Sequence, residues 1–372
     1  MIQSPENMTP FEYLDYLQSS CGASTTEISD NHIRQRHEDK LQSLSNQQSY
    51  WRRALEDELT KDEATPLQTR QEIRCFGDMV RLFQNQIEES IRILGKEPPT
   101  VAVGTLPLGD VNAATIPVPS GGYVIAFNVG LFGFIYQMAT VIGELLVPDS
   151  TGEDRVRYTI SKKQAFSKLA ESSESNDRFV DVLVSYLLHG NPWQAKKRFP
   201  DETVLDVANL LSISAELFVL GHEYAHIIGE HVGEVHSIKV GDATVEAINQ
   251  DWAQEIVADW NGALLMLSAQ ARKGLPASLT YWGAHFFFSC AAIVEDILFG
   301  EEESASHPSA LLRKEYLDKQ VAPHISEKEQ WEHAVGLSGL LHEIVGECWN
   351  RNKARFNQKL TEQGGLAPLW RK

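Results

Sequence analysis

Residues 216–229, with the sequence ELFVLGHEYAHIIG, are the stretch that is most informative about the fold. Because a helix turns about 100° per residue, His222 and His226 project from one face of a helix, one turn apart. Glu223 lies beside that face, and the apolar residues around it indicate burial. Two imidazoles and a carboxylate are costly to bury without a partner. The stretch therefore predicts a buried helix that holds a metal ion between two histidines.

The HExxH spacing is typical of a zinc site in which the glutamate does not bind the metal. The two imidazoles can each bind Zn²⁺ at about 2.0–2.1 Å. Glu223 is then placed to take a proton from zinc-bound water. The alternative is a structural use of His222 and His226 in the core or at a helix cap, and the apolar flanks favour the metal over it.

A second acidic stretch offers the third ligand. Glu255 and Asp259 are four residues apart in another predicted helix, hence on one of its faces. A zinc ion held by two histidines and one glutamate keeps its fourth position for water, which is typical of a catalytic rather than a structural zinc. Asp259 is placed to accept an N–H from a ligand imidazole and fix its tautomer. The alternative is a pair of solvated carboxylates on a helix surface.

A three-histidine site needs the pattern HExxHxxGxxH, with its third histidine at position 232. Gly229 fits that pattern, but residue 232 is valine and His231 comes one residue too early. We expect His231 and His236 to be surface or linker residues. The sequence therefore favours Glu255 as the third ligand of one zinc ion per chain.

Bulk composition limits the partners of this protein of 372 residues. Its formal net charge is -18, and so acidic a chain repels phosphate backbones, which makes a nucleic-acid partner unexpected. We expect no membrane span, because no stretch is a clean run of about 20 apolar residues. The four cysteines form no CxxC pair and no secretory signal is visible, which favours a cytoplasmic location. The oligomeric state stays open.

The predicted fold class is α+β, mostly helical, with a small mixed β-sheet. Three parts are expected: an N-terminal helical or linker extension (1–65), a main domain (66–325) and a C-terminal helical extension (326–372). Residues 148–203 are polar and predicted to be irregular, with one apolar patch, so they resemble an insertion. Predicted helices outside that segment cover most of 66–95, 131–146, 204–230, 250–267, 281–299 and 328–359.

Three strands are predicted at 100–103, 112–116 and 123–127. Pro117 directly follows the second strand, and proline cannot donate to a ladder, so this strand is expected to lie at a sheet edge or to end there.

The chain resembles the gluzincins, and within them the HtpX-like and CAAX-prenyl-protease-like metallopeptidases. One shared feature is HEYAH at 222–226 followed by EIVAD at 255–259. Another is NAATI at 112–116, which runs through Gly121-Gly122 into YVI and then Gly130-Leu131, similar to that family's pair of strands. The last is SHPS at 306–309 with Arg313, similar to the family's His-Pro…Arg segment.

The resemblance implies a zincin-like fold and several further site residues. An edge strand containing Asn112, Ala113 and Ala114 would hold an extended peptide by strand addition. The family's His-Pro segment makes His307 the first candidate to stabilise the oxyanion, with Arg313 orienting its loop or contacting substrate. Tyr281 and His285, on one face of the next helix, are alternatives for that role. The missing membrane spans, the segment 148–203 and both terminal extensions depart from the family.

These observations predict a zinc-dependent endopeptidase that cleaves protein or peptide substrates through water activated by zinc and Glu223. The alternative is a catalytically silent binding or regulatory protein of zincin-like fold, for example in a bacterial stress or phage-defence system. A silent relative would be expected to lose the glutamate of HExxH, and Glu223 is present.

Overall fold

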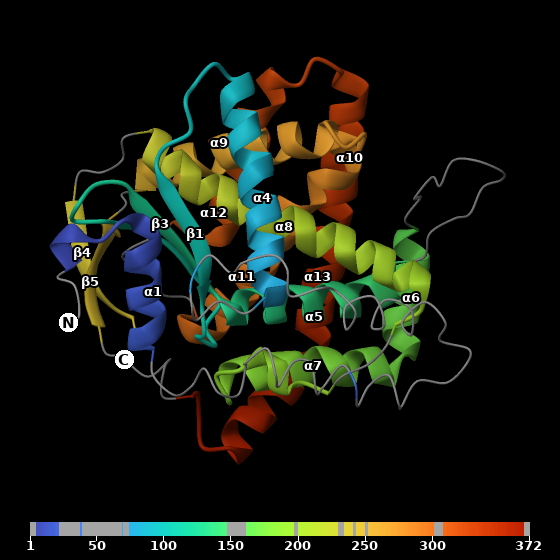
Figure 1. The fold of residues 1–372 in the computed structure, drawn as a ribbon. Helices are drawn as coiled ribbons and strands as arrows, with labels where there is room; N and C mark the ends of the chain where they lie inside the picture. The colour runs from blue at the N-terminus through green and yellow to red at the C-terminus, as the bar shows by residue number, and fades with distance from the viewer. Residues whose placement is uncertain are drawn as a thin grey trace.

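A three-stranded mixed sheet and the helices on its two faces make up the part of the fold that builds the site (Figure 1). The computed structural model describes residues 5–21, 38, 69, 74–146, 161–196, 200–229, 234–240, 243–249, 252–300 and 308–367. Within these residues helices predominate and accompany a small mixed sheet, so the predicted, mostly helical α+β class is confirmed.

The strands of the sheet are ordered β1-β3-β2. β1 (Val101–Leu106) runs parallel to β3 (Tyr123–Asn128), and β2 (Ala113–Pro117) pairs antiparallel with β3. Gly121 and Gly122, with φ of 107° and 83°, make the turn between β2 and β3, a conformation that favours glycine. The predicted edge position of the second strand is confirmed, and Pro117 occupies its last paired residue.

Alternate residues of the sheet face two different layers. Val124 and Ala126 pack in a small apolar cluster with α1 (Pro10–Ser20), whereas Ile125 and Phe127 belong to the main helical core. The first described helix therefore covers one face of the sheet, although the sequence suggested only an extension here.

The main core is helical and has α8 (Glu202–Ile228) at its centre, in contact with α5, α9 and α11. In Figure 1 α8 passes behind α4 and close to the sheet. The other helices of this core, all predicted as helical from the sequence, are α4 (Arg74–Ile93), α5 (Val129–Leu145), α9 (Trp252–Ala271), α11 (Trp282–Leu298) and α13 (Lys328–Glu362).

The expectation of irregular structure across 148–203 was wrong for most of its described residues. α6 (Lys162–Glu171) and α7 (Ser173–Leu187) are regular helices, with Ser161 and Ser172 as their N-caps. Each cap hydroxyl accepts a backbone N–H of the first turn, which is a standard helix start. The polar residues lie on the outer side while the apolar patch of α7 is buried against α5 and α13. Polar composition thus concealed an amphipathic pair.

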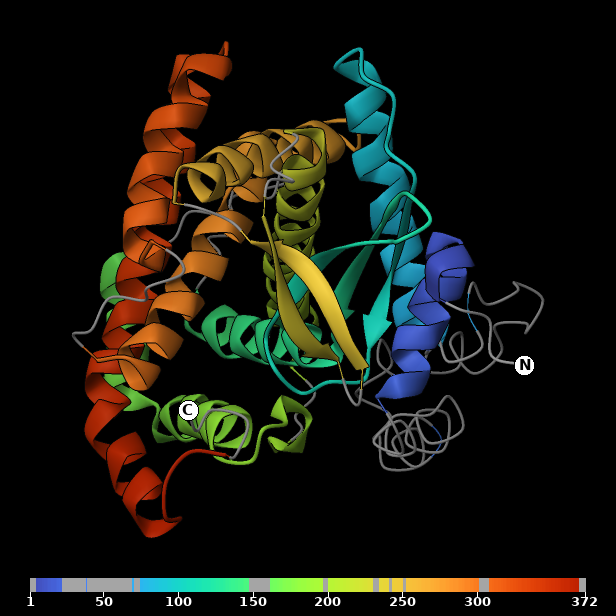
Figure 2. The same cartoon turned by 90° about the vertical axis from the view of Figure 1, so that its left-hand side faces the viewer.

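Shorter elements account for further parts of the described residues. They are η1 (Pro5–Asn7), η3 (Pro192–Gln194), α10 (Ala277–Thr280), α12 (Ala310–Val321) and η4 (Ala322–His324). A separate hairpin of β4 (Glu234–Val240) and β5 (Ala243–Asn249) links α8 to α9. It stands in the foreground of Figure 2, and β5 lies next to the edge strand β2.

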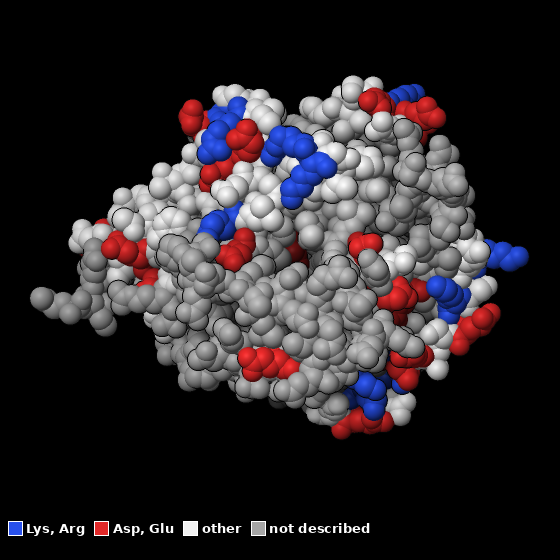
Figure 3. Space-filling view, turned by 45° about the vertical axis from the view of Figure 1, so that its right-hand side comes forward, with Lys and Arg blue, Asp and Glu red and all other residues white. Residues whose placement is uncertain are grey.

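Two helical stretches, Thr203–Ile228 and Ala277–Leu298, are long and apolar enough to cross a membrane. Most of each is buried inside the protein, as in core helices. On the face drawn in Figure 3 the described acidic and basic side chains are interspersed, without one continuous basic stripe.

Candidate metal centre

Two glycines let α8 and α9 touch directly beside the HExxH motif. A Cβ on Gly221 would lie 2.7 Å from the carbonyl oxygen of Gly262, and a Cβ on Gly262 would lie 2.6 Å from the backbone nitrogen of His222. Any larger residue at either position would push the helices apart. The close contact brings the last turns of α8 against the first turns of α9.

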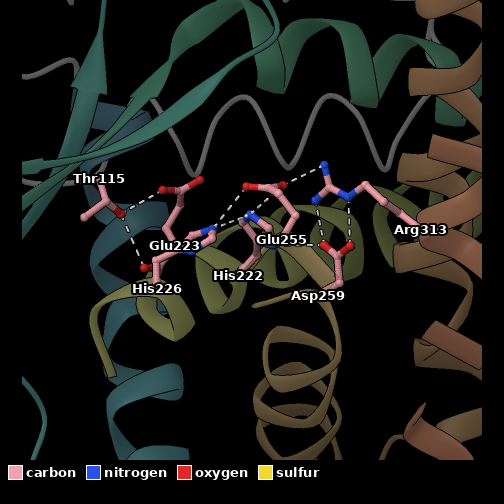
Figure 4. Close-up of polar contacts among 7 residues, drawn as sticks. All are labelled: Thr115, His222, Glu223, His226, Glu255, Asp259 and Arg313. Atoms are coloured by element: carbon pink, nitrogen blue, oxygen red, sulfur yellow. Dashed lines mark hydrogen bonds and ion pairs between the residues drawn. The ribbon is translucent and has the colours of Figure 1, made fainter. Parts of the chain in front are cut away.

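His222, His226 and Glu255 converge at this crossing, as the sequence predicted (Figure 4). The Nε2 atoms of the two histidines are 3.0 Å apart. His222 Nε2 lies 3.8 Å from Oε2 of Glu255, and His226 Nε2 lies 3.6 Å from its Oε1. All three side chains are buried, so the cluster is largely removed from water.

These separations suit a single tetrahedral metal ion. Four donors at about 2.0–2.1 Å from a zinc ion are about 3.3 Å from one another, and the observed values of 3.0, 3.6 and 3.8 Å lie around that figure. Glu255 also stands in the first turn of α9, where the helix dipole favours negative charge. The residues present therefore fit a metal ion bound by two nitrogens and one carboxylate.

Asp259 lies within hydrogen-bonding distance of His222. Its Oδ1 lies 2.9 Å from His222 Nδ1, and because a carboxylate only accepts, that nitrogen carries the proton. In the neutral ring the Nε2 lone pair then faces the cluster. Burial lowers the pKa of His222, but the hydrogen bond to Asp259 and the charge of Glu255 raise it by more. The predicted orienting role of Asp259 thus has the geometry that it requires.

Arg313, on α12, binds both acidic residues of α9. Its Nη1 is 3.0 Å from Glu255 Oε2, while Nε and Nη2 donate to the two oxygens of Asp259 at 2.8 and 2.6 Å. Burial alone would raise the pKa of Asp259, yet the charge and hydrogen bonds of Arg313 hold it below its usual value. The guanidinium is engaged by the carboxylates of Glu255 and Asp259, so its geometry is that of a positioning group.

Glu223 lies beside the three candidate ligands and is held by the sheet. Thr115 Oγ1, on β2, donates to Glu223 Oε2 at 2.7 Å. Burial raises the pKa of Glu223, while the nearby His222 and the Thr115 hydroxyl oppose that rise. A carboxylate with a raised pKa is a stronger base than an exposed glutamate, which suits a proton acceptor.

The net charge of this cluster is negative and would be balanced by a dication. Among its described side chains, Glu223, Glu255 and Asp259 are acidic and Arg313 is the basic counterpart. With neutral histidines and ionised carboxylates the group carries two negative charges. A buried excess of that size calls for compensation by a cation or by protons.

No family model matches the chain, and no curated protein or solved structure matches it.

Along the edge strand β2, the main-chain N–H and C=O groups of successive residues point alternately toward β3 and away from it. Asn128 N donates to Asn112 O at 2.9 Å and Val118 N donates to Gly122 O at 3.0 Å, which fixes the alternation of the ladder. Asn112, Ala114 and Ile116 consequently point their N–H and C=O groups toward β3. The groups of Ala113 and Thr115 point outward. Of the predicted substrate-contacting residues, Ala113 turns its main chain away from β3, on a strand that β5 also approaches, while Asn112 and Ala114 are used by the ladder.

Tyr281 and His285 belong to a different polar cluster. The Tyr281 hydroxyl and His285 Nε2 both donate to Asp318 Oδ1, each at 2.8 Å. Both side chains are fully buried. Burial lowers the pKa of His285, although Asp318 opposes this. Their described contacts thus join α11 to α12 and do not include the metal-site residues.

Other candidates lie outside the described residues. His307, the expected oxyanion donor, and His231 are among them, as is the side chain of His236. The structure instead reveals two contributors that we did not predict, Thr115 and the glycine pair of α8 and α9. Thr115 is 108 residues from Glu223, so no local spacing could have indicated the contact.

Proposed function

We propose that this protein is a zinc-dependent endopeptidase with a zincin-like fold. The observation that carries the proposal is the meeting of His222, His226 and Glu255 around a common point, with Glu223 beside them. Two histidines and one glutamate leave a coordination position open for chemistry, whereas structural zinc sites are usually closed by four protein ligands.

Each residue has a role that follows from its contacts. Bound zinc would supply a Lewis acid, which polarises a carbonyl and makes water more acidic. Glu223 accepts the proton of the attacking water and later delivers it to the leaving amine. Asp259 holds His222 in the ligating tautomer, and Arg313 holds Glu255 and Asp259 in place.

An extended peptide is the substrate that suits the edge strand. The N–H and C=O groups of Ala113 face away from β3, and this residue is only partly buried, so they can pair with a peptide main chain irrespective of its side chains. Thr115 also contacts Glu223, so a peptide on this edge would lie beside the base. The proposed substrates are therefore unfolded or flexible protein segments.

The test compares metal content and cleavage in four forms of the full chain: wild type, Glu223→Gln, His222→Ala and the control His189→Ala. His189 is exposed and follows α7. Metal per chain is measured by elemental mass spectrometry, and cleavage is measured on unfolded casein and on a peptide library made from a proteome digest. The wild type and the control are expected to hold one zinc ion and to cleave.

Glu223→Gln is expected to keep the metal and to lose at least about a hundredfold in rate, because a general base contributes that much or more. His222→Ala is expected to lose both metal and cleavage. Undiminished cleavage by Glu223→Gln would show that another group is the base. A zinc-loaded wild type that cleaves nothing in the library would replace the peptidase proposal with the binding protein.

A further inference from the structure

The Thr115 side chain is a rigid and buried hydrogen-bond donor to the proposed base. Its hydroxyl lies 2.7 Å from Oε2 of Glu223 and 3.3 Å from the Glu223 carbonyl oxygen. A hydroxyl carries one proton, and the shorter contact places it on the carboxylate. Threonine is β-branched and stiff at χ1, so the donor position follows the strand backbone.

The place of Thr115 in the ladder gives its side chain and its main chain different directions. Its side chain points to α8, and its main-chain N–H and C=O point away from β3, although Thr115 itself is buried and β5 lies next to β2. The same register gives Ala113 an outward main chain but no side chain able to hydrogen-bond. Among the described residues of β2, the contact between peptide-binding edge and base thus passes through Thr115.

We propose that Thr115 is a positioning residue, which sets the Glu223 carboxylate in fixed register with the edge of β2 where a peptide binds. The inference rests on the proposed peptidase function. A glutamate side chain has three rotatable bonds, and within a catalytic site an error of 1 Å is costly. Removing the hydroxyl would leave peptide binding intact and would let the base adopt other rotamers.

The first test uses steady-state kinetics on the zinc-loaded full chain. Thr115→Val removes the hydroxyl and keeps shape, and kcat is expected to fall about tenfold or more, with KM within about twofold of wild type. Thr115→Ser restores the donor and is expected to recover most of kcat. The control Thr140→Val deletes another buried hydroxyl, which among the described residues donates to the Tyr136 carbonyl within α5, and is expected to match wild type.

A Thr115→Val variant with the kcat of wild type would overturn the inference and leave the peptidase proposal standing. So would a loss that appears only in KM. Equal losses in Thr115→Val and Thr115→Ser would also overturn it, since the hydroxyl would not be the cause.

A second test does not depend on cleavage. Unfolding equilibria are measured for wild type, Thr115→Val, Glu223→Ala and the double variant. If the hydrogen bond to the carboxylate is formed, the Thr115→Val change is expected to raise the unfolding equilibrium constant about tenfold more in the presence of Glu223 than in its absence. Additive effects would overturn the inference whatever the activity. Coupling in a zinc-loaded wild type that cleaves nothing would instead overturn the proposed function, and with it the catalytic meaning of the contact.

Discussion

Gly221 and Gly262 meet backbone to backbone where α8 crosses α9, with room for no side chain between them. The contact lies directly before the HExxH motif and less than one turn beyond Asp259. Helices normally pack with their axes 8–10 Å apart, as side-chain size dictates, and glycine pairs permit the short end of that range. The candidate metal ligands of two different helices can converge because of this crossing.

Gly262→Ala is therefore expected to damage the metal centre from outside it. The new Cβ would lie 2.6 Å from the backbone nitrogen of His222, so a helix must shift. We expect a stability loss of about 1–3 kcal/mol, as for other overpacked cores, and weaker zinc binding in competition with a chelator. Gly346→Ala is the control, because a Cβ there meets nothing within 4 Å in the helix α13, and it should stabilise by about 0.5–1 kcal/mol. Wild-type zinc affinity in Gly262→Ala would contradict the role given to the crossing.

Arg313→Met is expected to destabilise the protein most when the metal is removed. The substitution leaves Glu255 and Asp259 buried without their guanidinium, and breaking such a buried pair costs about 3–5 kcal/mol. Zinc would compensate for part of the lost charge, so the cost should be smaller in the loaded protein. Urea unfolding with and without zinc measures the difference.

The control for Arg313→Met is Lys319→Met, on the same helix but exposed. It should change stability by no more than about 0.5 kcal/mol. If Arg313→Met cost the same in both metal states, its charge would not be coupled to the metal ligands.

The sequence predicted the three candidate metal ligands because their placement depends on local spacing. His222 and His226 are one turn apart, and Glu255 and Asp259 again share a face, so periodicity alone placed each pair. The strands and most helices followed from the same kind of pattern. The edge position of β2 could be inferred from the proline at residue 117.

Long-range contacts could not be predicted in that way. Thr115 reaches Glu223 across 108 residues, and Arg313 reaches Asp259 across 54. Resemblance pointed to Arg313 but suggested a loop or substrate contact, whereas the structure gives it the two carboxylates of α9. The helices α6 and α7 were missed because polar residues dominate their composition and only one side is buried.

Ala113→Pro is expected to weaken peptide binding without altering the base. The Ala113 N–H points away from β3, so proline removes a donor to the proposed peptide and no hydrogen bond of the ladder with β3. KM should rise several-fold, with kcat close to wild type. Ala114→Pro is the matched contrast: its N–H faces β3, and its loss should lower the unfolding temperature instead. An unchanged KM in Ala113→Pro would show that peptides do not bind along β2.

The buried His285 is expected to make folding stability depend on pH in the weakly acidic range. Burial lowers its pKa, so the folded protein keeps it neutral, with Nε2–H donated to Asp318, while the unfolded chain protonates it below about pH 6.5. The unfolded state then binds more protons, and stability is lost as pH falls from about 6.5 toward the folded pKa, at up to about 1.4 kcal/mol per pH unit.

Tyr281, Lys314 and His342 also interact with the pair of His285 and Asp318, and burial likewise lowers the pKa of His342. Urea unfolding of wild type and His285→Gln at intervals from pH 8 to 5.5 isolates the His285 contribution, because the other histidines are common to both. Glutamine can still donate to Asp318 but does not titrate, so its stability should fall less steeply, and parallel curves would contradict the assignment.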